Sequence, residues 1–407
     1  MNKIVKLKIE DLKDPAVKLA YQNTLRIKLD NTDIENEQDI EKAWELYRNS
    51  LLESANNVCG RKVVGGARCK RTQWWNEDVR KIVKEKKLAW KRYLVSKSTE
   101  DFELYKTKRK QASEEVKRSK QLQWEKFGEK LEDNFRENQK LFWGAVKRSR
   151  QTTQSPNKHI KNNHGEIIKE RGKILETWKD YFQTLHNPNI TIDNEDSSTY
   201  DESNNDDSNS EDDEITMGEL IRAKKKIKLG KAAGADEIFP EMVAYQDSKA
   251  DKLLLKICQI AYKDKIIPND WNISVIIPIH KSGPTTQCEN YRGISLLSVP
   301  SKVYARIIET RLREKVENKI EQYQSGFRSG RSVQDHIYAL RQLSEITYRY
   351  NKKAHICFID LQKAFDSVNR EQLWKALREH NVDTNLIKVI QSFYINPKGT
   401  VRINGGV

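Results

Sequence analysis

Hydrophobic positions in the first half of the chain recur at the spacing of one helix face. The pattern predicts helices over four segments: 14–27, 38–52, 79–93 and 102–135. A Ser-Thr-Glu-Asp run at Ser98–Asp101 predicts the start of the last segment, because such side chains cap the free N–H groups of a first helical turn. An aromatic-rich amphipathic helix is expected within Gly165–Leu185.

From Ile215 onward the pattern changes to a mixture of helices and strands. The β-branched run Ile273–Ile279 predicts a strand, and the apolar run His355–Ile359 predicts a short buried strand that ends at Asp360. Further helices are expected at Pro240 and over six segments: 217–227, 252–263, 302–315, 333–349, 370–380 and 386–394. The chain is therefore expected to be of the α+β class.

Charge is distributed unevenly along the 407 residues, a length typical of two or three domains. The chain holds 74 Lys and Arg against 59 Asp and Glu, for a net charge of +15, which favours a nucleic-acid partner over an anionic membrane. Residues 193–214 contain 11 acids and no Lys or Arg, and predict a disordered acidic linker. The expected organisation has five parts: an N-terminal helical segment (1–69), a basic helical region (70–150), a connector (151–192), the linker and a mixed domain (215–407).

The basic helical region is open to two interpretations. It carries 24 Lys and Arg against 13 Asp and Glu. It could be an ordinary solvated helical hairpin, which might also self-associate through its apolar stripe, or it could contact the phosphates of a nucleic acid. The pair Trp74-Trp75 is expected to be a packing anchor, although stacking on bases is the alternative.

Cysteine usage and apolar run lengths exclude other classes. Five cysteines without a Cys-x-x-Cys pair argue against a disulfide framework and a cysteine-rich zinc site, and favour a reduced intracellular location, nucleus or cytoplasm. The longest apolar runs fall far short of the ~20 residues that span a bilayer, so no membrane partner is expected.

Three blocks in the second half carry the candidate chemistry: Asn290–Val299 (NYRGISLLSV), Gln324–Ser332 (QSGFRSGRS) and Asp360–Asp366 (DLQKAFD). An isolated acid after a strand is typical of a turn or a helix cap. In this order and spacing, however, the blocks resemble the fingers and the first palm motif of non-LTR (LINE-type) retrotransposon reverse transcriptases.

Shorter stretches extend this resemblance. Residues 233–236 with 240–242 are similar to the opening fingers motif, and residues 278–283 to the fingers hairpin. Residues 74–77 and 178–182 resemble the region between endonuclease and polymerase of RTE-like elements.

The resemblance implies an incomplete right-hand polymerase fold, with fingers and part of the palm, preceded by the basic helical region. It implies an RNA-directed DNA polymerase that adds dNTPs to a DNA primer on an RNA template by two-metal phosphoryl transfer. Mg²⁺ is the implied cofactor. Asp360 is then the catalytic carboxylate and a metal ligand, and Leu361 would lie at the metal through its backbone.

Other roles carry over from the same resemblance. Lys281 and Arg292 match the fingers cations that close on the triphosphate, with an ordinary surface charge as the alternative for Lys281. Lys363 and Ala364 lie in the turn under the triphosphate. Phe365 matches the residue that excludes a ribose 2′-hydroxyl, with a core phenylalanine as the alternative. Two further arginines, set among glycines, are expected at the nucleic-acid backbone: Arg328 and Arg331.

One feature departs from the family pattern. No aromatic-Ala-Asp-Asp block follows Asp366, and this block would supply the other two metal-binding acids. The chain is therefore expected to be a truncated copy, without the endonuclease domain and the rest of the palm, and inactive alone. The alternative function is a non-catalytic nucleic-acid-binding remnant that acts through the basic helices and the fingers.

Overall fold

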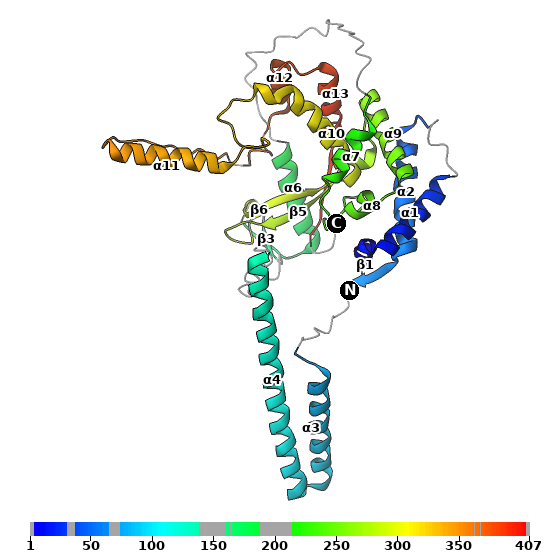
Figure 1. Ribbon diagram of the computed structural model, residues 1–407, viewed down its shortest axis with the longest axis vertical. Helices are drawn as coiled ribbons and strands as arrows, with labels where there is room; N and C mark the ends of the chain where they lie inside the picture. Colours follow the sequence, from blue (N-terminus) through cyan, green and yellow to red (C-terminus); the bar gives the residue numbers. More distant parts are fainter. Residues whose placement is uncertain are drawn as a thin grey trace. The chain divides into compact units, whose positions relative to one another are not determined.

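The computed structural model describes residues 4–30, 37–64, 74–137, 143, 159–162, 165–187, 214–361, 363–366 and 368–403. The chain divides into two compact units (Figure 1): Met1–Val5 with Val63–Pro156, and Lys6–Lys62 with Asn157–Val407. Helices and small sheets occur together, so the α+β expectation is confirmed. Nearly all of the predicted acidic linker, residues 193–213, lies outside the described residues.

The N-terminal helices form where the sequence predicts them. After β1 (Ile4–Leu7) and the 3-10 turn η1 (Ile9–Lys13) come α1 (Pro15–Asp30) and α2 (Ile40–Cys59), followed by β2 (Arg61–Val64), which pairs with β1. The Asp39 side chain accepts hydrogen bonds from the backbone N–H groups of Glu41 and Lys42, and so caps the start of α2.

The second half alternates helices with short strands. Its helices and 3-10 turns are α7 (Met217–Lys225), α8 (Pro240–Ala244), α9 (Ser248–Asp264), η2 (Asn269–Asn272), η3 (Cys288–Asn290), α10 (Val299–Val316), η4 (Glu317–Lys319), α11 (Val333–Arg349), α12 (Arg370–Glu379) and α13 (Thr384–Ser392). The helices predicted from apolar periodicity are confirmed, and α11 has the predicted bounds.

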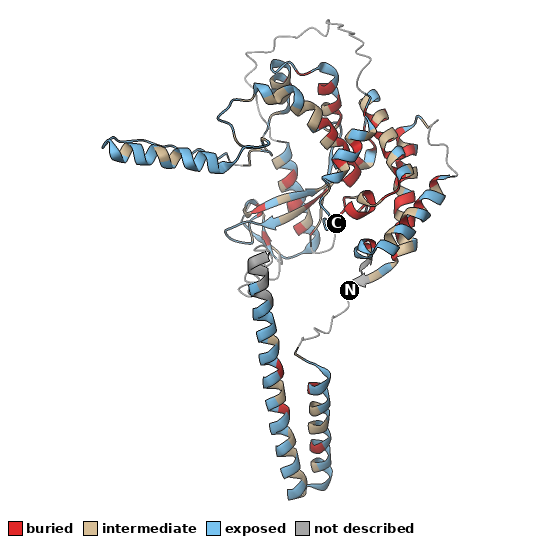
Figure 2. Cartoon of the chain, viewed as in Figure 1, coloured by how far each residue is buried: buried red, intermediate tan, exposed pale blue. Residues whose placement is uncertain are grey.

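The main hydrophobic core joins the N-terminal helices to the second half of the chain. Side chains of α1, α2, α7, α9, α10 and α13 are buried together in it, and Figure 2 shows the buried residues gathered on these helices. Two polar contacts tie α2 to the distant segment: Tyr47 donates to Gln246 at 2.7 Å and the Trp44 indole donates to Asp270 at 2.9 Å. Residues 6–62 thus share one core with residues 215–389.

A smaller core lies between one helix and a three-stranded sheet. The strands β5 (Ile273–His280), β6 (Tyr291–Leu296) and β7 (Lys398–Val401) lie in the order β6-β5-β7, and α6 (Arg171–His186) packs against them. The short pair β3 (Ile160–Lys161) and β4 (Ile167–Ile168) adjoins this core through Ile160. The predicted strand at 273–279 and the aromatic helix within 165–185 are therefore confirmed.

The other unit is a helical hairpin of α3 (Glu77–Ser96) and α4 (Thr99–Glu137). Its two helices meet through aromatic pairs, with 4.7 Å between the ring centroids of Trp90 and Tyr105 and 5.0 Å between those of Tyr93 and Phe102. The Ser98 hydroxyl accepts from the N–H of Asp101 at 3.2 Å, so the predicted cap of α4 is confirmed.

The predicted strand at His355–Ile359 is wrong. The segment is exposed irregular chain, with Phe358 at 80% and Ile359 at 84% of full exposure. A strand is stable only when a neighbour completes its backbone hydrogen bonds and covers its apolar face. No described strand pairs with this segment. Among the helices that the structure describes, none has the length and apolarity needed to cross a bilayer.

Candidate functional site

The β5-β6 hairpin places two of the predicted triphosphate cations on one face of the sheet. In the antiparallel register Arg292 lies opposite Ile279. Lys281, two residues after Ile279 and directly after β5, continues the ladder because its N–H donates to the carbonyl of Asn290 at 2.9 Å. Cross-strand partners and residues two apart along a strand point to the same side. Arg292 and Lys281 are both exposed. The hairpin therefore presents two cations together to solvent.

The opposite face of the hairpin is covered by α6. The indole of Trp178 meets the ring of Tyr291 edge to face, with 5.0 Å between centroids. Gly293 lies against Phe182: a Cβ atom there would come within 2.6 Å of the Phe182 ring. Glycine at 293 is therefore required by close packing between strand and helix.

Asn290 and Tyr291 hold the loop that leads into Arg292. The Asn290 side-chain amide donates to the carbonyl of Pro284 at 2.9 Å, and the Tyr291 hydroxyl donates to the carbonyl of Thr285 at 2.7 Å. Gly283 turns this loop with a φ of +78°, a conformation that glycine adopts without strain. The sequence identified Asn290 and Tyr291 as part of a block but gave no reason for them; the structure assigns them to loop bracing.

The stretch 233–236 lies against the end of the first block. A Cβ atom on Gly234 would come within 2.7 Å of the backbone of Leu297 and Ser298, so glycine permits this contact. Asp236 is almost fully buried, and burial raises the pKa of its carboxyl group. Its carboxylate also accepts from the N–H of Ile238 at 3.2 Å. Sequence reasoning gave no role to Asp236, because nothing in the pattern marks an acid as buried.

Asp360, the predicted catalytic carboxylate, is exposed just before a turn. Among the described residues no hydrogen bond or ion pair engages it, and Leu361 beside it is also exposed. Its carboxylate is thus available to a ligand from solvent. Gln362 lies outside the described residues.

The turn after Asp360 is fixed to α6. The Lys363 ammonium donates to the Tyr181 hydroxyl at 2.7 Å, and the Asp366 carboxylate lies 3.9 Å from the imidazole of His186. Ala364, between them, is partly buried, whereas Phe365 is exposed and meets the Phe327 ring edge to face at 5.8 Å. The same helix therefore contacts the sheet and the turn.

The two arginines predicted to contact the nucleic-acid backbone differ in their exposure and in their contacts. Arg328, at 10% side-chain exposure, donates to the Glu317 carboxylate at 2.9 Å and to the carbonyl of Glu321 at 2.9 Å, so its guanidinium braces the chain after α10. Arg331 is exposed. Contact of either arginine with nucleic acid stays a prediction.

The described residues do not fit a complete magnesium site. Mg²⁺ requires several hard oxygen ligands, and no group of three His, Cys, Asp or Glu side chains that could hold a metal ion occurs in the described part of the chain. Asp360 supplies one carboxylate, and Asp366 faces His186 instead.

Comparison with known proteins identifies the class to which the last third of the chain is related. Residues 279–406 match the family described as reverse transcriptase (RNA-dependent DNA polymerase). The segment is thus similar to part of a reverse transcriptase domain, and the predicted resemblance to reverse transcriptases is confirmed.

The relatives come from mobile elements. The chain is 31% identical over 157 residues to a probable RNA-directed DNA polymerase from transposon BS of Drosophila melanogaster, covering 38% of this chain and 17% of that protein. It is 25% identical over 296 residues to the RNA-directed DNA polymerase from mobile element jockey of Drosophila funebris, covering 71% and 32%. It is 25% identical over 190 residues to an uncharacterized 149 kDa protein of transposon TX1 of Xenopus laevis, covering 47% and 14%. The chain thus spans less than a third of each of these relatives.

Proposed function

We propose that this chain supplies the nucleotide-facing part, the fingers and the beginning of the palm, of an RNA-directed DNA polymerase of a LINE-type retrotransposon. The observation that carries the proposal is that Lys281 and Arg292, both within the reverse transcriptase match, share the open face of the sheet. Its expected partners are an RNA template, a DNA primer and a dNTP.

The hairpin has the chemistry for a triphosphate. Arg292 can donate two parallel hydrogen bonds to phosphate oxygens, and Lys281 adds a compact charge beside it. The loop contacts of Asn290 and Tyr291 hold the start of β6, so the arginine is positioned before the ligand arrives.

Catalysis needs more than the described residues provide. In-line attack of a primer hydroxyl on the α-phosphate is accelerated by divalent ions that neutralise the developing charge. Holding them takes several carboxylates, and Asp360 is one. We therefore assign nucleotide contact to this chain, and expect it to have no polymerase activity by itself.

Triphosphate binding tests this proposal. With the 407-residue chain, a primer on an RNA template and a fluorescent dNTP analogue, we expect Arg292→Ala to weaken binding by about 10-fold to 100-fold, the loss of a charge-assisted hydrogen bond. The matched control is Lys263→Ala, which removes one exposed cation at the end of α9. Equal affinities of the two variants would contradict the proposal.

A further inference from the structure

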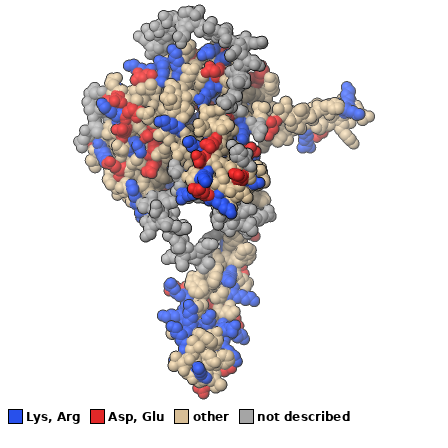
Figure 3. Space-filling model, turned by 180° about the vertical axis from the view of Figure 1, so that it is seen from behind, with Lys and Arg blue, Asp and Glu red and all other residues tan. Residues whose placement is uncertain are grey.

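The α3-α4 hairpin concentrates positive charge. Between residues 80 and 120 the sequence has 15 Lys and Arg against six Asp and Glu. Figure 3 shows Lys and Arg side chains crowding this hairpin. The positions of these cations show that the positive charge is not spread evenly around the hairpin.

On α3 the cations form a row along one flank. Arg80, Lys84, Lys87 and Lys91 are spaced by four, three and four residues, so they lie one above another, and all four are exposed. The row rises about 16 Å along the helix axis.

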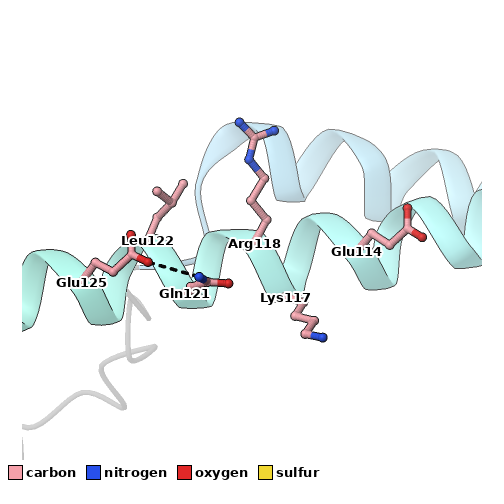
Figure 4. Close-up of a pocket in the computed structure, with 6 residues that line it drawn as sticks. All are labelled: Glu114, Lys117, Arg118, Gln121, Leu122 and Glu125. Atoms are coloured by element: carbon pink, nitrogen blue, oxygen red, sulfur yellow. Dashed lines mark hydrogen bonds between the residues drawn. The ribbon is translucent and has the colours of Figure 1, made fainter.

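A second row runs along α4. It consists of five exposed cations: Lys106, Arg109, Lys110, Lys117 and Lys120. From first to last it rises about 21 Å. Figure 4 shows Lys117 and Arg118 pointing to opposite sides of α4, which separates the row from the other flank. The shallow hollow of about 320 Å³ drawn there is lined by α4 alone.

Both rows lie on the same side of the hairpin. The helices meet through Val79 and Ala89 of α3 and through Ala112 and Ser119 of α4, which are buried. Each residue turns an α-helix by about 100°. Viewed along its own chain direction, each helix carries its row about 130° around the axis from this contact, and the sense of rotation is the same in both helices. Because the two helices run antiparallel, equal rotations bring the two rows to one side.

The opposite side is mixed. It carries three cations, Lys81, Arg92 and Arg118, among four acids, Glu85, Glu100, Glu114 and Glu125. Lys108 lies near the contact between the helices and pairs with Glu85 at 2.8 Å. The remaining two cations are Lys86, which is half-buried, and Lys97, which directly follows α3.

We propose that the nine cations of the two rows, here called the basic face, bind the phosphate backbone of a nucleic-acid duplex. The helix axes are about 8–10 Å apart, the usual distance between packed helices, and the rows lie farther apart than the axes because each is turned away from the contact. The rows can therefore lie across a groove of a duplex, whose major groove is about 12 Å wide, and contact the two strands that border it. Seven of the nine have no ion-pair partner in the described part of the chain: Lys84, Lys87, Lys91, Arg109, Lys110, Lys117 and Lys120, the last of which lies over the ring of Trp74. The contact is independent of base sequence, because phosphates carry no sequence information. This inference goes beyond the polymerase proposal and does not depend on it.

The test compares two triple variants of the full chain with equal loss of charge. Lys84→Gln, Lys87→Gln and Lys110→Gln together remove three cations from the basic face. Lys81→Gln, Arg92→Gln and Arg118→Gln together remove three from the other side. Glutamine keeps a good helix propensity, and circular dichroism confirms that each variant retains its helices.

Binding to a short random-sequence DNA duplex is measured across a salt series. Each lost phosphate contact should reduce the magnitude of the slope of log K against log[salt] by about 0.9. At 0.1 M salt this corresponds to an affinity that is weaker by about eightfold. We expect the first variant to lose two to three such contacts, and the second to bind within about twofold of the unmodified chain.

Equal losses in the two variants would overturn the proposal, since net charge alone would then explain binding. So would binding only to a single strand of the same sequence. Stronger binding to phosphatidylserine vesicles than to the duplex would also overturn it, and would assign the face to a membrane surface.

Discussion

Two segments that lie in or beside the motif blocks of the sequence, residues 290–299 and 355–361, differ sharply in how they are packed. Residues 290–299 form a strand and a cap whose side chains brace a loop and fit against α6. Residues 355–361 lie exposed without a paired strand. Both runs contain apolar residues typical of a strand, so the difference comes from their packing partners. Residues 290–299 pack against α6 and β5, whereas no described helix or strand packs over residues 355–361.

The largest effect is expected when a larger side chain replaces the glycine that packs against α6. We expect Gly293→Val to lower the free energy of unfolding by about 3 kcal/mol or more, because the new side chain would overlap Phe182. Urea denaturation measures the loss. A variant as stable as the parent would show that α6 does not pack against β6 as described.

A partly buried ion pair gives the next effect. Arg311 donates to both carboxylate oxygens of Glu219, at 2.7 and 3.0 Å. Burial by itself raises the pKa of Glu219, but hydrogen bonds from Arg311 and Thr216 outweigh it, so the pKa falls from 4.5 to about 2. We expect Arg311→Ala to cost about 2 kcal/mol near neutral pH, discounted for partial exposure.

The pH dependence of that cost has a defined sign. A carboxyl whose pKa is lowered in the folded state stabilises the fold above its ordinary pKa, and this stabilisation disappears as the pH falls toward the folded value. The difference in unfolding free energy between the parent and Arg311→Ala should therefore shrink between about pH 4.5 and pH 2. A constant difference over that range would mean that the ion pair does not cause it.

The smallest change in the free energy of unfolding is expected for a substitution within the exposed residues 355–361. Phe358→Ser should change the free energy of unfolding by less than about 0.5 kcal/mol, since its ring is already in solvent. Hydrogen exchange should be fast at residues 355–361 and slow in β5. A loss above about 2 kcal/mol would show that Phe358 is buried in solution.

The sequence predicted helices well and the site less completely. Apolar periodicity and capping residues located α2, α4 and α11, because these signals are local. The strand at 355–359 was predicted from composition, yet strand formation depends on a distant neighbour that composition does not reveal.

The site residues show the same limit. The pattern identified Lys281 and Arg292, but only the register puts both on one face. That Arg328 is engaged by Glu317, and that Lys363 contacts Tyr181 from a segment 182 residues away, depends on tertiary contacts that no local pattern carries.

Primer extension tests most directly whether the described residues provide nucleotide contact without the carboxylates that catalysis needs. The purified 407-residue chain is incubated with dNTPs, a DNA primer on an RNA template and Mg²⁺, beside its Asp360→Ala variant. We predict no nucleotide incorporation by either protein, because Asp360 is the only candidate metal-binding carboxylate among the described residues, and one carboxylate cannot hold the ions that the reaction needs. Incorporation by the parent that Asp360→Ala abolishes would contradict this account.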